Sequence, residues 1–175
     1  MRAPRLAALL VGIGLAWPVL VSAFDGNDVA TVFFIRKSEN VNRVDYGIVL
    51  DAHCRPEGDE PVVAYWRRLT RGPNVTEALG FPARRAYGIS SQSVRRDAEG
   101  GHVSLRLRAL SSRRIVVSVR PMNGGCRAWA TTTIAGEAAQ IVDIYVVLSG
   151  RISVDHIELT GRTPDGRRVV EQLRP

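Results

Sequence analysis

Three acidic residues near the end of the sequence have side chains of the type that acid–base hydrolysis uses. Asp143, Asp155 and Glu158 lie in two successive segments rich in valine and isoleucine. A glycosidase needs two carboxylates about 5–9 Å apart, and adjacent strands could bring two of these three that close. Charged residues that alternate with valine are also typical of solvent-facing strand positions. An envelope-directed hydrolase is therefore an alternative function, and no residue is assigned a catalytic role.

The other catalytic and metal-binding patterns are incomplete. His53, His102 and His156 fall on three separate segments, without an H-E-x-x-H motif. The stretch YGISSQS lacks the second glycine of a nucleophile elbow, and no glycine-rich phosphate loop precedes a helix. We expect no cofactor and no metal, and we favour a protein that is not an enzyme.

Aromatic and arginine side chains in the first half of the sequence are better candidates for function. Tyrosine and arginine supply contact area and hydrogen bonds at binding surfaces. Because successive strand residues point to opposite faces, Tyr65 and Trp66 cannot both line one cavity. The alternative is that the tyrosine hydroxyls simply reach water at the rim of a sheet. We predict a ligand-binding surface drawn from five residues: Arg36, Tyr46, Tyr65, Trp66 and Tyr87.

The stretch RKSENVNR, residues 36–43, lies between two apolar runs and predicts the turn of a hairpin. Serine and asparagine suit turns because their side chains bond to their own backbone. We therefore predict a structural role at this turn for Asn40 and Asn42. Whether Arg36 beside them also reaches a ligand stays open.

Short strands must carry these residues. Residues 44–50 and 114–120 alternate apolar and polar side chains with the period of a half-buried strand. Asn123-Gly124 and the stretch TPDGR are turn signals between such segments. About nine or ten short strands, spaced roughly 8–12 residues apart, favour a mainly β domain, an antiparallel barrel or sandwich.

One region departs from the strand pattern. Asn74 is a possible N-cap for the helix-favouring residues 76–79, and Pro82 would limit the helix. The sequence therefore predicts one short helical segment over residues 76–79, followed by a return to extended structure at Tyr87.

Residues 1–23 have the order of a secretory signal peptide. Two arginines precede an almost wholly apolar run, and small or modest residues lie at 21–23. A membrane anchor is the alternative, but Trp17-Pro18 interrupts the run, and a spanning helix needs about 20 apolar residues. We expect cleavage after Ala23, a single domain over residues 24–175, no membrane span after cleavage, and a secreted or periplasmic protein. The oligomeric state is open.

The charge of the chain does not favour nucleic acid as a partner. Without Arg2 and Arg5, the chain has 22 of its 24 basic residues and 17 acidic ones, which gives a net charge of +5. A basic stripe would be the footprint of a polyanion, but these arginines are scattered along the whole chain. We expect no nucleic-acid binding.

Two cysteines, Cys54 and Cys126, remain after the leader. Exported proteins meet an oxidising environment, in which a cysteine pair usually forms a disulfide. The competing role is a thiol nucleophile or metal ligand, but neither cysteine lies in a C-x-x-C motif. We predict a Cys54–Cys126 disulfide, which would stabilise the fold by roughly 4 kcal/mol on the loop-closure estimate.

Five stretches of the chain occur in a fixed order: FFIRKSENVNRVDY, PVVAYWRR, VTEALGFPARRAYGI, TTTIAGEAAQIVDIYV and VDHIELTGRTPDGRRVVE. Together they resemble the patterns of a bacterial family of domains of unknown function, number 4833, over nearly the whole mature chain. The resemblance implies an exported bacterial domain. The cysteine pair is not part of the pattern. The resemblance gives weight to seven positions: Arg36, Asn40, Asn42, Tyr46, Tyr65, Trp66 and Tyr87.

These observations favour a non-catalytic binding module that holds a small ligand or a cell-envelope partner. The alternatives are the hydrolase and a purely structural envelope protein.

Overall fold

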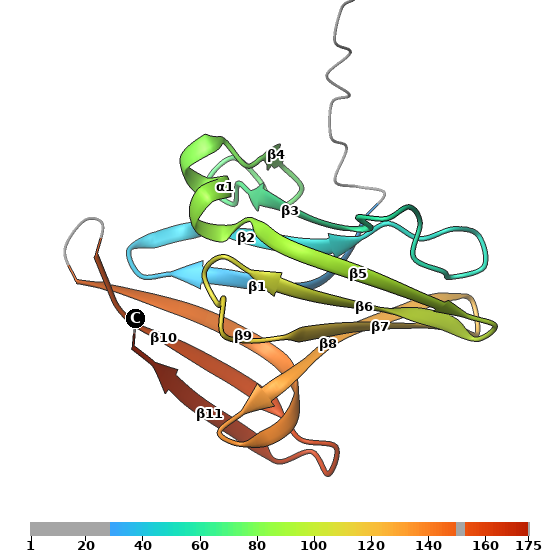
Figure 1. The fold of residues 1–175 in the computed structure, drawn as a ribbon. Coiled ribbons are helices and arrows are strands. Elements are labelled where there is room, and N and C mark those ends of the chain that lie inside the picture. Colours follow the sequence, from blue (N-terminus) through green and yellow to red (C-terminus); the bar gives the residue numbers. More distant parts are fainter. Residues whose placement is uncertain (1–28, 150–152, 175) are drawn as a thin grey trace, which may run out of the picture.

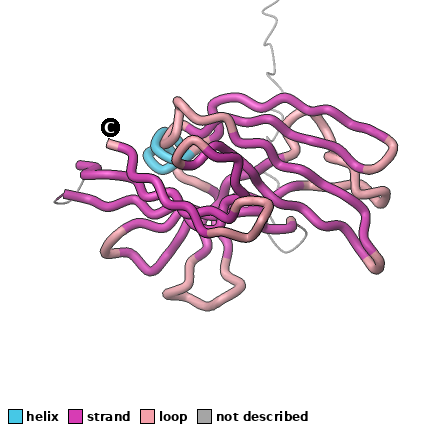
Figure 2. The backbone as a smooth tube through the Cα atoms, turned by 90° about the horizontal axis from the view of Figure 1, so that it is seen from below, coloured by secondary structure: helices cyan, strands magenta, loops and turns pink. Residues whose placement is uncertain are grey.

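Strands make up most of the residues that the computed structural model describes, 29–149 and 153–174 (Figure 1). Figure 2 shows the same chain with its strands, its loops and α1 in different colours. The predicted leader, residues 1–23, lies outside the described residues. The elements are β1 Ala30–Lys37, β2 Asn40–Ile48, β3 Val62–Arg67, β4 Thr76–Ala78, α1 Phe81–Tyr87, β5 Ile89–Asp97, β6 Gly100–Leu107, β7 Ile115–Met122, β8 Gly125–Ile134, β9 Glu137–Ser149, β10 Ser153–Arg162 and β11 Arg168–Leu173.

The eleven strands form one sheet in the order β4-β3-β2-β1-β9-β8-β7-β6-β5; β10 also pairs with β9, and β11 pairs with β10. The mainly β prediction is confirmed, and the sheet does not close into a barrel. Its two halves lie over one another in a sandwich-like arrangement (Figure 1). The sheet is mixed, because β1 and β9 run parallel. Parallel neighbours come from segments far apart in the chain, so no local turn signals them.

The core lies between the two halves of the sheet and follows the predicted alternation. On β7, Ile115, Val117 and Val119 are buried, while Arg120 is exposed. Val44 on β2 faces the same core from the other half. Each such side chain stabilises the fold by about 1.5–3 kcal/mol when fully buried, so the core holds the two halves together.

The helix prediction was wrong in position. Residues 76–78 form strand β4, which pairs with the edge of β3 from Tyr65↔Ala78 to Arg67↔Thr76. The helix begins instead at Phe81, with Pro82 in its first turn. Proline is tolerated there because the first helical N–H groups have no intrahelical partner. Pro82 therefore begins the helix rather than limiting it.

The first hairpin turns at Ser38 and Glu39, since Lys37 pairs with Asn40. Asn40 and Asn42 lie at the start of β2. The Oδ1 atom of Asn40 accepts the backbone N–H of Asn42 at 2.9 Å. The Oδ1 atom of Asn42 accepts the backbone N–H of Thr70 at 3.2 Å, so it fixes the loop after β3 to β2.

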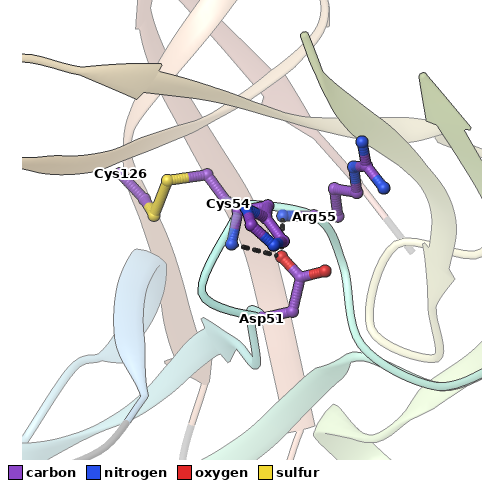
Figure 3. The surroundings of a disulfide bond; sticks show 5 residues. Asp51, Cys54, Arg55 and Cys126 are labelled. Atoms are coloured by element: carbon purple, nitrogen blue, oxygen red, sulfur yellow. Dashed lines mark hydrogen bonds between the residues drawn. A yellow bond between two sulfur atoms is a disulfide. The ribbon is translucent and has the colours of Figure 1, made fainter. Parts of the chain in front are cut away.

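The predicted disulfide is confirmed: Cys54 and Cys126 are bonded, with 5.4 Å between their Cα atoms. Figure 3 shows how Asp51 shapes the turn that presents Cys54. The Oδ1 atom of Asp51 accepts the backbone N–H groups of His53 and Arg55, each at 2.8 Å. The bond joins the loop after β2 to the start of β8, and so ties the two halves of the sheet together.

The described part of the chain contains no helix with the length and apolar character needed to cross a membrane.

Candidate functional site

Strand β5, at one end of the sheet, approaches β3, which lies next to the end strand β4, and a cleft of about 420 Å³ lies between β3 and β5. We call it the strand-edge cleft. One wall is the first half of β3, and the other is the first half of β5. Its lining residues include Glu60, Val62, Ala64, Leu79, Arg84, Gly88 and Gln92.

The β3 wall is a strand edge that is only partly paired. The backbone N–H of Arg68 donates to Val75 (2.8 Å), and Trp66 pairs with Glu77 of β4. In a strand, the backbone N–H and C=O of every second residue point to the same side. Those of Arg68 and Trp66 point toward β4, so those of Ala64 point to that side as well. Strand β4 ends at Ala78, and no described strand pairs with Ala64 on that side.

At Val62 a side chain takes the place of the missing strand. The Oε1 atom of Gln92 accepts the Val62 N–H at 3.1 Å, and its Nε2 atom donates to the Val62 C=O at 3.2 Å. A primary amide carries the same donor and acceptor as a peptide group. Gln92 therefore bridges the cleft at Val62 with the bonds that a neighbouring strand would make.

Helix α1 borders the other end of the cleft. The guanidinium of Arg84 donates to the carbonyl of Leu79 at 3.2 Å, and the Leu79 side chain is buried. The N–H of Gly88 donates to the carbonyl of Arg84, and its own carbonyl accepts the N–H of Arg108, both at 2.9 Å. A Cβ atom at Gly88 would collide with that Arg84 carbonyl, so only glycine fits this close contact with the last turn of α1.

Three of the five predicted ligand residues meet beside the cleft. Tyr46 stacks on Phe33 with 4.6 Å between ring centroids, and its hydroxyl donates to the carbonyl of Tyr87 at 2.5 Å. Trp66 meets Tyr87 edge to face at 6.3 Å. Burial raises the pKa of the Tyr46 and Tyr87 hydroxyls. Tyr46 is fully buried and fixes the end of α1, whereas Trp66 and Tyr87 are half-buried.

The other two predicted residues lie elsewhere. Tyr65 is buried on the opposite face of β3, with its hydroxyl 3.0 Å from that of Thr31. Arg36 donates from Nε to Asp143 at 3.0 Å and lies over the ring of Tyr145. The structure therefore separates Tyr65 from Trp66, in line with the alternation of strand faces, and it places Arg36 apart from both.

Sequence reasoning missed a buried ion cluster on the face that carries Tyr65. Asp45 is inaccessible to solvent, and it accepts from Nε of Arg43 at 2.7 Å and from Nε of Arg67 at 2.5 Å. The hydrogen bond to Asp45 raises the pKa of Arg67. All groups are paired, which is the condition under which a buried charge is tolerated, so the cluster is structural.

The three acidic residues weighed for hydrolysis do not all line one hollow. Asp143 and Glu158 line one hollow of about 410 Å³, but Asp155 is bound to Nδ1 of His156 at 2.7 Å. Both oxygens of Asp143 accept from Arg36. This leaves Glu158 as the acidic group in the hollow without a described hydrogen-bond partner.

A serine, a histidine and an aspartate also meet on the outer face of β5–β7. Nδ1 of His102 lies 3.0 Å from Oγ of Ser118, and its Nε2 lies 4.0 Å from Asp97. Acyl transfer also needs oxyanion donors aimed at the reacting carbonyl. Here Ser118 lies in a central strand whose neighbours β6 and β8 pair on both sides, so its backbone amides are used in the sheet.

No three histidine, cysteine or acidic side chains within residues 29–149 and 153–174 are grouped so that they could hold a metal ion. His53, His102 and His156 lie in a turn, on β6 and on β10.

The family model for "Domain of unknown function (DUF4833)" matches residues 33–172, from within β1 to within β11. The chain belongs to the DUF4833 family. The matched range contains every residue of the strand-edge cleft and the aromatic side chains beside it. No curated protein and no solved structure matches the chain. The family description names no activity, so the function of this DUF4833 domain has to be argued from its own geometry.

Proposed function

We propose that this DUF4833 chain is an exported, non-catalytic binding module that holds an extended segment of a partner protein in the strand-edge cleft. The observation that carries the proposal is the pair of hydrogen bonds from the Gln92 amide to Val62. These bonds take the place of a neighbouring strand at Val62. The same edge of β3 continues to Ala64, where no described strand pairs with it on that side.

Extended peptides bind exposed sheet edges through main-chain hydrogen bonds. The cleft offers two edges to one segment, β3 on one wall and β5 on the other. Its volume of about 420 Å³ is within the range of roughly 300–1,000 Å³ for ligand sites. Trp66 and Tyr87, half-buried beside the cleft, add the aromatic contact area that binding surfaces favour.

Two features support the exported location. The first 23 residues have the order of a signal peptide. The Cys54–Cys126 disulfide is a bond that persists in oxidising compartments and is rare in the cytosol.

The two alternatives have weaker support. A glycosidase acts through a pair of carboxyl groups, but both oxygens of Asp143 are engaged by Arg36. A purely structural role does not explain the partly paired edge at Ala64. Exposed strand edges favour unwanted pairing, and proteins usually protect them.

A random hexapeptide library displayed on phage, selected on the mature chain, tests the proposal. We expect enrichment of extended, β-favouring sequences whose binding is lost in Ala64→Pro, because proline removes the N–H that faces the cleft. The control Ala64→Thr keeps that N–H and should bind. No enriched peptide, or peptides that bind Ala64→Pro as well as wild type, would overturn the proposal. A cooperative thermal unfolding transition of Ala64→Pro, like that of wild type, confirms that the variant folds.

A further inference from the structure

A second hollow of about 320 Å³ adjoins the cleft at α1. It is lined by Phe81, Arg84, Arg85 and Arg108, and we call it the arginine hollow. Arg84 lines both the cleft and this hollow. A segment that leaves the cleft past Arg84 would therefore pass over the arginine hollow.

The arginine hollow is positively charged, and no carboxylate in its lining neutralises that charge. None of its lining residues is acidic. Among the described residues, Arg84, Arg85 and Arg108 form no ion pair with a carboxylate, whereas Arg68 is paired with Glu77. The Arg84 guanidinium is held at the boundary by its bond to the Leu79 carbonyl. Phe81, 78% exposed, gives the hollow an apolar wall.

The cleft is also polarised along its length. Glu60 lies among its lining residues near Val62, and Arg84 lies at the other end. The two walls run antiparallel, because Val62 meets Gln92 while Trp66, further along β3, meets Tyr87 before β5. A bound segment with its negative end toward α1 would match both ends.

We infer that the segment bound in the cleft is acidic: it places one or more carboxylates over the arginine hollow, next to Arg84, Arg85 and Arg108. The inference rests on the proposed function and names the class of ligand. Arginine is suited to this task because its planar guanidinium binds carboxylates through two parallel hydrogen bonds. The carboxylates could come from acidic side chains or from the end of a chain.

The test uses the peptides that the library selection enriches. Each is synthesised in three forms: as selected, with Asp and Glu replaced by Asn and Gln, and with a C-terminal carboxamide. We expect wild type to bind the acidic form about tenfold or more tightly than the neutral one, and this preference to shrink in 0.5 M salt because salt screens exposed charges. The carboxamide form separates a terminal carboxylate from acidic side chains.

The double variant Arg85→Gln, Arg108→Gln should lose the preference for the acidic form. The matched control Arg114→Gln, Arg120→Gln removes the same charge at exposed positions on or beside β7, and should keep it. Peptides that bind in an Ala64-dependent way without any acid preference would overturn this inference and leave the proposed function intact. Absence of any Ala64-dependent peptide would overturn the proposed function, and this inference with it.

Discussion

The side-chain amide of Gln92 lies against the backbone of Val62 as a peptide group of a neighbouring strand would. It accepts from the Val62 N–H and donates to the Val62 C=O, at 3.1 and 3.2 Å. Gln92 lies on the end strand β5, and Val62 lies on β3, next to the other end strand β4. The bond pair therefore holds the two edges near one another and leaves the cleft beyond it open at Ala64.

Gln92→Leu should lower the free energy of unfolding by about 1–3 kcal/mol, because it leaves a part-buried N–H and C=O of Val62 without partners. Urea unfolding of the mature chain measures the change. Ser93→Ala, on the same strand and exposed, is the control and should change stability little. Equal stability of Gln92→Leu and wild type would show that the amide does not hold the edges together.

Asp45→Asn should destabilise the fold by about 3 kcal/mol. It removes the charge that Arg43 and Arg67 share, and breaking a buried ion pair on one side costs about 3–5 kcal/mol. We take the low end because the arginine side chains keep some solvent contact, with 26% and 16% exposed. Thermal and urea unfolding measure the loss, with the exposed Asp59→Asn as control. A loss below 1 kcal/mol would contradict the structural role given to Asp45.

Removal of the disulfide in Cys54→Ala, Cys126→Ala should destabilise the chain by about 4 kcal/mol, since the bond closes a loop of 72 residues. Urea unfolding measures the loss. Wild type unfolded in the presence of a reductant should show a similar loss. If the variant unfolds at the same urea concentration as oxidised wild type, the bond contributes little to stability.

Stability should fall as the pH drops through about 4 and below. The backbone N–H of Arg55, and then that of His53, hold the pKa of Asp51 below its usual value of 3.8. The ion pairs to Arg68 and Arg167 lower the pKa values of Glu77 and Glu137. A carboxyl group with a lowered pKa stabilises the folded state at neutral pH, and this contribution is lost as the group is protonated.

The variant Asp51→Asn tests whether the charge of Asp51, rather than its hydrogen bonds, causes its share of the pH dependence. The Oδ1 atom of asparagine can still accept both N–H groups but cannot be protonated. The variant should therefore lose less stability than wild type when urea unfolding is compared at pH 7 and pH 3. An unchanged difference between the two pH values would show that Asp51 does not contribute.

The strands and their turns were predictable because alternation and turn residues are local signals. The Asn123-Gly124 turn, for example, joins β7 and β8 as expected. Residues 76–79 were misassigned to helix because the favourable partner of Thr76–Ala78 is the edge of β3, which lies outside any local window. The pairing of β1 with β9 escaped prediction for the same reason.

The candidate site was predictable only in part. Tyr46, Trp66 and Tyr87 were selected by residue type, and they do meet. Gln92 carries no local signal, because its partner Val62 is 30 residues away and is reached only when the sheet folds over. Asp45 lies at a polar position of the alternating residues 44–50, a pattern that does not reveal that Arg43 and Arg67 cover it.

Hydrogen exchange at the backbone amide of Ala64, followed by NMR with and without a saturating library-selected peptide, tests the central claim most directly. If a partner segment pairs with β3 in the cleft, exchange at Ala64 should slow about tenfold or more, because its N–H becomes hydrogen-bonded. The exposed amide of Gly124, in the hairpin turn away from the cleft, should be unaffected. Exchange at Ala64 that stays the same while the peptide is bound would contradict strand pairing in the cleft.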